Sequence, residues 1–181
     1  LAFANDERLL ITMHTPAGGM GDKKLLESLA AIIEKYPGVK IILAHMGIYL
    51  KEGDFEVFMN TDLPNSENIL LDISFATEKS VFDAALTHKN LRKRILFASD
   101  NPFGIMTGGE FFTASGEALL ITRSKYTWSE EGTYGYNLTF NTYHCLKALK
   151  DALDDAEKNI SKQEMIKQDI FLGNAIAALP K

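Results

Sequence analysis

Three apolar segments of strand length end in an ionisable side chain, and they constrain the possible folds more than any other feature of the chain. Two of them end at His14 and His45, and the third ends at Asp100. A continuous apolar run of this length predicts a strand buried on both faces, as in a parallel sheet. Such proteins collect their chemical groups at the carboxyl ends of the strands. The sequence therefore predicts a site formed by these three side chains.

Strands and helices alternate over the first hundred residues. Capping residues and helical spacing predict helices over residues 22–36, 54–59 and 77–88, and a further apolar run predicts a strand over residues 69–75. Strands that recur at intervals of roughly 30 residues, with helices between them, pair in parallel through right-handed crossovers. We therefore expect an α/β fold built from parallel βα units, as a single domain over residues 1–181.

A glycine-rich turn, residues 16–21, follows the first predicted strand. It resembles a phosphate-binding loop only loosely, because it matches neither the dinucleotide-binding nor the Walker pattern. We interpret it as a loop in which glycine permits unusual backbone conformations.

Residues 104–137 lack a clear period, and we expect them to form an irregular, aromatic-rich loop or lid, with a short helical turn over 117–123. The segment is either a functional loop or a structural addition packed on the outside. Its aromatic residues are expected to line a pocket or to fill a small core: Tyr126, Trp128, Tyr134, Tyr136 and, just beyond it, Phe140.

The end of the chain is predicted to be helical. One helix is expected over residues 140–158, and a capping box from Ser161 to Glu164 is expected to open a second. Gly173 and Asn174 are expected to interrupt that helix before a last turn over 175–179.

Composition and charge exclude several classes of partner. The net charge is −5 and no long basic run is present, so neither a nucleic-acid partner nor a membrane partner is expected. No segment approaches the roughly 18 apolar residues of a membrane helix. The only cysteine, Cys145, excludes an internal disulfide and a Cys-rich zinc motif, and it fits a buried thiol in the reducing cytoplasm. The expected partner is a small-molecule substrate.

The three strand-end residues match the chemistry of a divalent metal. Zinc accepts imidazole and carboxylate ligands while keeping a position open for water, whose pKa it lowers to about 7. We predict His14, His45 and Asp100 as metal ligands, with Zn²⁺ as the expected ion and Mn²⁺ as the alternative. Taken singly, each histidine is more typical of a hydrogen-bonded residue at a strand end than of a ligand, and Asp100 could cap a turn. The three together favour the metal site.

Three other residues of similar chemistry receive different interpretations. His88 lies near a predicted helix end and His144 lies on a predicted helix, so neither is expected to bind metal. Asp72 lies inside a predicted strand and is a candidate to support one of the ligands.

The segments that carry these residues resemble a known family. They are Leu9–Thr15, Pro37–Gly47, Ile69–Ser74, Arg94–Pro102 and Phe171–Ala175. Together they resemble the second half of the amidohydrolase superfamily, in the branch that contains amidohydrolase-related hydrolases and aminocarboxymuconate-semialdehyde-type decarboxylases. The resemblance implies strands five to eight of a (β/α)8 TIM barrel followed by C-terminal helices.

The same resemblance implies roles for the site residues. His14 corresponds to the metal-binding histidine of the fifth strand, and His45 to the sixth-strand histidine that ligates metal or acts on the substrate. Asp100 corresponds to the eighth-strand aspartate, which binds metal and exchanges a proton with water or substrate. Asp100 and His45 are thus the expected catalytic residues.

The sequence also departs from the family pattern. The first strand of the family supplies a His-x-His pair, which is absent among the four histidines here. The chain is therefore expected to be the C-terminal half of such an enzyme, incomplete on its own, and to associate with a copy of itself or with a missing N-terminal half.

The leading functional hypothesis is a metal-dependent hydrolase that cleaves a C–N or C–O bond of a small molecule with metal-activated water. One alternative is a metal-dependent, non-oxidative decarboxylase of the same family, and another is a non-catalytic α/β interaction module. A doubly wound α/β domain also remains open; it would reverse its strand order, whereas a half barrel would keep neighbouring strands consecutive.

Overall fold

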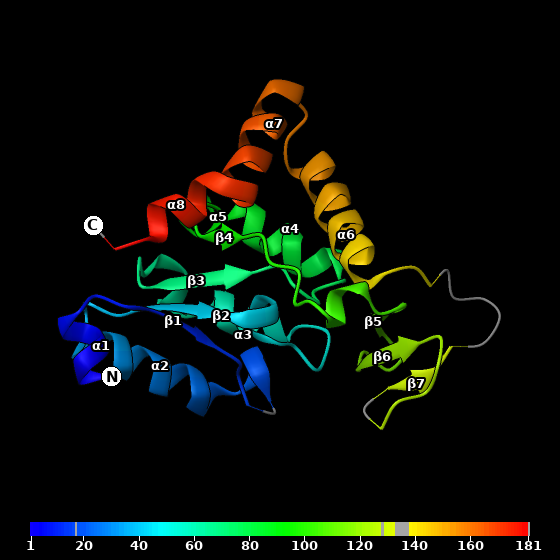
Figure 1. Ribbon diagram of the computed structural model, residues 1–181, viewed down its shortest axis with the longest axis horizontal. Helices are drawn as coiled ribbons and strands as arrows, with labels where there is room; N and C mark the ends of the chain where they lie inside the picture. Colours follow the sequence, from blue (N-terminus) through cyan, green and yellow to red (C-terminus); the bar gives the residue numbers. More distant parts are fainter. Residues whose placement is uncertain (17, 128, 133–137, 181) are drawn as a thin grey trace.

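A four-stranded parallel sheet organises the structure (Figure 1). The computed structural model describes residues 1–16, 18–127, 129–132 and 138–180. The strands are β1 (Leu10–Met13), β2 (Lys40–Leu43), β3 (Ile69–Asp72) and β4 (Ile95–Leu96). They pair in the order β1-β2-β3-β4, and each pair of neighbouring strands is parallel. The predicted mixed α/β fold with parallel βα units is confirmed, and this sheet has no reversal of strand order within the described residues.

Helices follow β1, β2 and β3 as the sequence predicts. The α-helices are α1 (Ala2–Asp6), α2 (Lys23–Lys35), α3 (Asp54–Met59), α4 (Lys79–Thr87), α5 (Lys89–Arg92), α6 (Asn141–Ala156), α7 (Ile160–Gln168) and α8 (Asn174–Ala178). The two short helices α1 and α5 were not predicted. Short 3₁₀ turns occur at η1 (Gly19–Gly21), η2 (Ala44–Gly47), η3 (Leu63–Asn65) and η4 (Phe103–Ile105), and η5 (Asp169–Gly173) is a π-helix. Asp22 caps α2 as predicted, because its Oδ1 accepts the backbone N–H of Lys24 at 2.9 Å.

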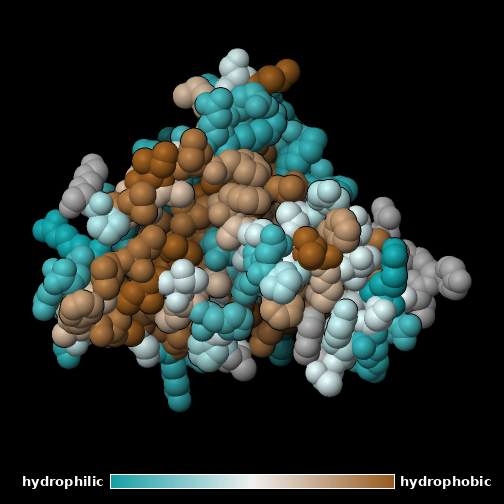
Figure 2. Space-filling model, in the orientation of Figure 1, coloured by the Kyte–Doolittle hydropathy of each residue, from teal (hydrophilic) through white to brown (hydrophobic). Residues whose placement is uncertain are grey.

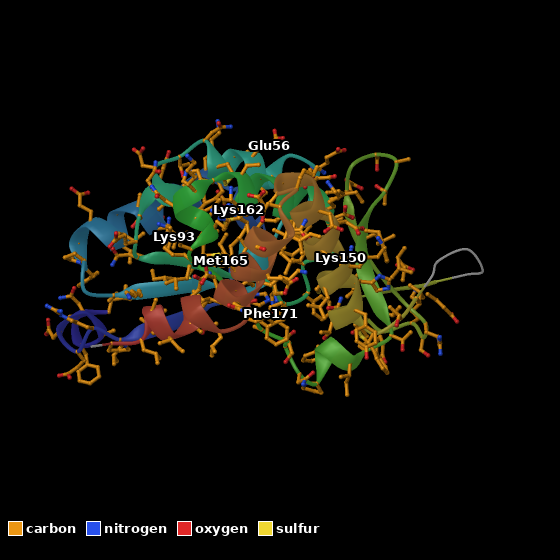
Figure 3. The ribbon with its side chains drawn as sticks, turned by 90° about the horizontal axis from the view of Figure 1, so that it is seen from above. Glu56, Lys93, Lys150, Lys162, Met165 and Phe171 are labelled. Carbon is orange, nitrogen blue, oxygen red and sulfur yellow. The ribbon has the colours of Figure 1, made fainter. Side chains whose placement is uncertain are left out.

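Alternate residues of the strands enter two separate apolar clusters. Ile11, Ile41 and Ile69 point to the side covered by helices, where they join the main core with side chains from α2, α3, α4 and α6. Leu70 and Leu96 point to the other side, where they pack with Ala178 of α8 and with the partly buried Leu10 and Ile42. Figure 3 shows α2 and α4 on one side of the sheet and α8 on the other. One face of the sheet is thus well covered and the other is covered only in part.

The expectation of an irregular segment over residues 104–137 is wrong for part of its described residues. A second sheet forms there, from β5 (Gly108–Phe112), β6 (Ala118–Thr122) and β7 (Glu130–Glu131). β5 and β6 are an antiparallel hairpin whose turn contains Gly116 with φ +79°. The helical turn expected over 117–123 is therefore a strand, because its apolar residues pair with β5 instead of packing at helical spacing.

Of the aromatic residues in this region, Trp128, Tyr134 and Tyr136 lie outside the described residues. Tyr126 and Phe140 are 44% and 45% exposed, and Tyr126 lines a surface pocket beside η4 that contains none of the predicted site residues.

The helical ending is confirmed, but its boundaries differ from the prediction. α7 is capped by Asn159, whose Oδ1 accepts the N–H of Lys162, rather than by Ser161. The helical path also continues through η5 into α8 instead of breaking at Gly173. Asn174 is buried there and its amide donates to the carbonyls of Arg92 and Ile95 at 3.2 and 2.9 Å, which holds α8 against β4.

In the part of the chain that the structure describes, none of the helices has the length and apolar character required to cross a membrane.

Replacing Asn174 with alanine is expected to lower the free energy of unfolding by about 1–3 kcal/mol, because the buried carbonyl of Ile95 and the partly buried carbonyl of Arg92 lose their donor. Urea denaturation measures this difference. Asn60→Ala is the matched control, since Asn60 is exposed. An equal effect of the two substitutions would contradict the role of Asn174.

Candidate functional site

The three predicted site residues line one pocket at the carboxyl ends of the strands. His14 directly follows β1, His45 lies in η2 after β2, and Asp100 lies four residues beyond β4. The pocket has a volume of about 340 Å³. Its other lining residues are Ile48, Phe75, Phe103, Glu110 and Leu120. The parallel strands therefore bring together side chains that are far apart in the sequence.

The two histidines lie side by side. Their ring centroids are 5.2 Å apart, and the rings meet edge to face at 77°. The hydroxyl of Thr15, the residue after His14, donates to the carbonyl of Gly47 at 2.8 Å. Thr15 is 2% exposed. This buried hydrogen bond ties the end of β1 to the turn after β2, and so it fixes the spacing of the two imidazoles.

Hydrogen bonds determine which nitrogen of each imidazole carries the proton. The Nδ1 atom of His14 lies 3.0 Å from the carbonyl oxygen of Thr15, and the Nδ1 atom of His45 lies 3.0 Å from the carbonyl oxygen of Ser74. A carbonyl oxygen can only accept, so both Nδ1 atoms donate in the neutral rings. Both Nε2 atoms therefore keep a free lone pair.

Asp72 fixes the position of His45 through hydrogen bonds. The buried carboxylate of Asp72 accepts the backbone N–H groups of His45 and Ser74, at 3.1 and 3.0 Å, and also the hydroxyl of Ser74. Because the Ser74 hydroxyl donates to Asp72, its oxygen accepts from His45 Nδ1 at 2.9 Å. The chain of bonds from Asp72 through Ser74 to His45 holds both the ring orientation and the tautomer.

The backbone around the pocket is strained. Four of the lining residues, His45, Ile48, Phe75 and Asp100, have positive φ angles of 58°, 60°, 61° and 52°. Residues other than glycine avoid this region, and each such residue costs about 1–3 kcal/mol. Strain of this kind is typical of functional sites, where the surrounding structure holds it in place.

Gly19 explains part of the role of the glycine-rich turn. Its φ is +48°, and a Cβ at this position would collide with the carbonyl oxygen of Ile48. The same carbonyl accepts the N–H of Met20 at 2.8 Å. The glycine therefore allows the turn to support the strained backbone after His45, in agreement with a structural loop rather than a phosphate cradle.

The structure adds one ionisable residue that the sequence analysis missed. Glu110 of β5 lines the pocket, and burial raises its pKa to about 7, with a further contribution from the nearby carboxylate of Glu78. A hydrogen bond from Tyr49 opposes this shift. The hydroxyl of Tyr49 is in turn held by the backbone N–H of Thr77 at 3.2 Å. A carboxyl group with a pKa near neutrality can both accept and donate a proton at physiological pH.

The described residues offer an incomplete set of metal ligands. The two Nε2 lone pairs of His14 and His45 fit a metal ion, because ligating histidines usually donate their other ring nitrogen to a carbonyl or carboxylate. Asp100 lines the same pocket. However, no group of three or more His, Cys, Asp or Glu side chains among the described residues is disposed to hold a metal ion. The pocket thus presents two oriented imidazoles with a carboxylate nearby, rather than a finished coordination sphere.

The remaining two histidines make hydrogen bonds that stabilise the fold, and the cysteine is buried. His88 Nδ1 accepts the N–H of Leu91 and caps α5, and His144 Nε2 accepts the N–H of Thr139. Burial raises the pKa of the Cys145 thiol to about 12, so it stays protonated and unreactive.

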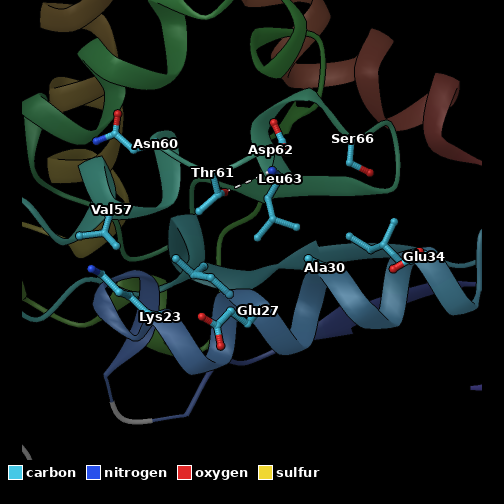
Figure 4. A pocket seen from close by; sticks show the side chains of 12 residues that line it. Lys23, Glu27, Ala30, Glu34, Val57, Asn60, Thr61, Asp62, Leu63 and Ser66 are labelled. Atoms are coloured by element: carbon cyan, nitrogen blue, oxygen red, sulfur yellow. Dashed lines mark hydrogen bonds between the residues drawn. The ribbon is translucent and has the colours of Figure 1, made fainter.

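A larger cavity, of about 780 Å³, lies outside the sheet between α2 and the segment from α3 to η3 (Figure 4). Lys23, Glu27 and Glu34 of α2 lie on one side of it, and Asn60 and Asp62 lie on the other. None of the predicted site residues lines this groove. Volume alone does not define a site, so the strand-end pocket remains the candidate.

No known protein family matches the chain, and no curated protein matches it either. Among solved structures, the chain is similar to the crystal structure of an amidohydrolase II, with 16% sequence identity and a TM-score of 0.47. The alignment covers 96% of this chain and 52% of that one, so the chain spans about half the length of the protein it matches. A TM-score of this size supports no argument about activity, which must come from the pocket itself.

Replacing Glu110 with glutamine is expected to stabilise the protein at alkaline pH. A carboxyl whose pKa rises on folding, here from 4.5 to about 7, makes the folded state bind more protons between these values. The free energy of unfolding of the wild type therefore falls as pH rises through this window. Glutamine has no proton to lose, so the Glu110→Gln variant does not lose stability in this window. We expect the variant to be more stable than the wild type by on the order of 2 kcal/mol near pH 8 and equally stable near pH 4.

Urea denaturation at the two pH values measures the difference. Glu117→Gln, at an exposed position on the same hairpin, is the matched control. An effect of Glu110→Gln that is equal at both pH values would contradict the assignment.

Proposed function

We propose that the strand-end pocket is the site of a metal-assisted hydrolase that cleaves a C–N or C–O bond of a small molecule. The observation that carries the proposal is the shared tautomer of His14 and His45, each of which has Nδ1 bonded to a carbonyl and Nε2 free. The resemblance of the sequence to the amidohydrolase superfamily also supports it. A divalent ion, Zn²⁺ or Mn²⁺, would supply Lewis acidity towards a carbonyl group and acidify a water molecule.

The residues of the chain would hold the ion and transfer the protons. His14 and His45 would hold the ion through Nε2. Asp100 lines the same pocket and would have to reorient its side chain to become the third protein ligand. Asp100 would also take a proton from the attacking water, and Glu110 would return a proton to the leaving group, since its pKa of about 7 allows it to be protonated at neutral pH. The apolar side chains of Ile48 and Leu120 suit a small organic substrate.

One observation favours a second candidate, the non-oxidative decarboxylation of a small carboxylic acid. Loss of carbon dioxide leaves a carbanion that must be protonated, and a carboxyl group that is partly protonated at neutral pH is a suitable donor. Glu110 meets this requirement within the pocket. An esterase and lactonase panel, assayed beside a decarboxylase panel of hydroxybenzoates, separates the two reactions by their products.

Metal binding tests the proposal before any substrate is known. We expect the purified protein to bind added Zn²⁺ or Mn²⁺ in stoichiometric amount, as measured by isothermal titration calorimetry and elemental analysis. His14→Ala, His45→Ala and Asp100→Ala are each expected to lower the affinity at least about tenfold, because each removes a proposed ligand.

The control variant is His88→Asn, which keeps an acceptor at the N-cap of α5 and lies outside the pocket. Affinity that is unchanged in all three pocket variants would contradict the proposed ligands. Absence of binding by the wild type at every concentration would favour a non-catalytic α/β module.

A further inference from the structure

The face of the four-stranded sheet opposite the main core presents a broad apolar surface. Figure 2 shows apolar residues gathered across this side of the molecule, over α8 and the strands. At its centre, Leu70 and Leu96 are buried against Ala178 of α8, with 2% and 6% exposure, while Leu10 and Ile42 pack beside them and stay partly exposed. We call this sheet face, together with α8, the open face.

Exposed apolar side chains extend the open face beyond the strands. Asn174 and Ala178 of α8 face the sheet. Ile176 lies two residues from each of them along the helix and therefore faces away from the sheet. It is 59% exposed. Leu179, the residue after Ala178, is 56% exposed.

The ring of Phe171 extends the surface past the end of β4. It stacks on Phe97, with a centroid distance of 4.9 Å, and both rings are exposed, at 44% and 39%. Figure 3 places Phe171 on the same side of the molecule as α8. The open face therefore spans the sheet from β1 to η5.

The two edges of the sheet differ. Along the outer edge of β4, the carbonyl of Ile95 accepts from Asn174, and the N–H of Phe97 donates to the carbonyl of Ile170 at 3.0 Å. β4 is thus closed by the C-terminal segment. β1 pairs with β2 and has no second strand among the described residues, so its outer edge is available.

We infer that a second copy of this chain covers the open face, in a symmetric dimer centred on β1 and α8. The four exposed residues around the cluster, Ile176, Leu179, Phe97 and Phe171, present together with the partly exposed Leu10 and Ile42 on the order of 500 Å². A two-fold interface would bury this surface on both copies, about 1,000 Å² in total, which is the lower limit for a specific interface. A two-fold axis places the same patch of each copy face to face, so apolar surface would meet apolar surface.

Charge argues against a membrane as the occupant. A surface that binds anionic lipid carries a cluster of basic side chains around its apolar area. The chain has a net charge of −5. Lys40, Lys93 and Arg94 line a pocket beside Leu70 and Ala178, together with Glu67. Two of these cations are already bonded within the chain, because Lys40 donates to the carbonyl of Ala178 at 3.1 Å and Arg94 donates to the carbonyl of Ile69. This inference is independent of the proposed function, because none of its residues lines the strand-end pocket.

Sedimentation velocity over low- to high-micromolar concentrations tests the inference. We expect a monomer–dimer equilibrium in the wild type. Ile176→Asp is expected to raise the dimer dissociation constant at least tenfold, because it places a charge in the interface. Ile176 is exposed in the single chain, so the substitution should leave the fold intact, and circular dichroism checks this.

The matched control is Met165→Asp on α7, a residue that is 64% exposed and lies outside the cluster of the open face (Figure 3). It is expected to leave the dissociation constant unchanged. Hydrogen exchange adds a second measurement, in which dimerisation should slow exchange in β1 and α8. A monomer at every concentration would overturn the inference, and so would a dimer that Ile176→Asp does not weaken or an association that requires lipid vesicles.

Discussion

The carboxylate of Asp72 is the group on which the geometry of the pocket depends. It is buried at the end of β3, and its Oδ1 atom accepts two backbone N–H groups and one hydroxyl. Through Ser74 it holds the ring of His45, and through the backbone it holds the left-handed turn in which His45 lies. A buried carboxylate with these partners stabilises an arrangement that the local backbone would otherwise avoid.

The second sheet gives the pocket its other wall. β5 and β6 bring Glu110 and Leu120 to the ends of strands that belong to the first sheet. Contacts join the two parts, since the hydroxyl of Thr77 donates to the carbonyl of Glu110 and the N–H of Phe112 donates to Glu78 at 2.8 Å. The hairpin therefore combines a structural role with the delivery of a carboxyl group whose pKa lies near neutrality.

The sequence predicts the parallel strands and the position of His14, His45 and Asp100 because these features follow from local patterns. Each strand is a short apolar run. Each of the three site residues either follows such a run directly or lies a few residues beyond its end. Glu110 could not be found in this way, because Gly108 and Gly109 obscure the strand and the pKa depends on contacts with distant residues.

The link between Ser74 and His45 also escapes prediction, since it joins residues 29 positions apart. Asn174 shows the same limit: its place in a helix follows from the sequence, but its bonds to Arg92 and Ile95 exist only in the folded chain.

The tautomer of the two pocket histidines is the most direct test of the account. Long-range ¹H–¹⁵N correlation spectra of protein labelled with ¹⁵N-histidine, recorded where the imidazoles are neutral, report which ring nitrogen carries the proton. The account predicts that His14 and His45 are both protonated at Nδ1, with Nε2 unprotonated. A proton on Nε2 of either ring would contradict it, because that nitrogen would then be a donor and could not bind a metal ion.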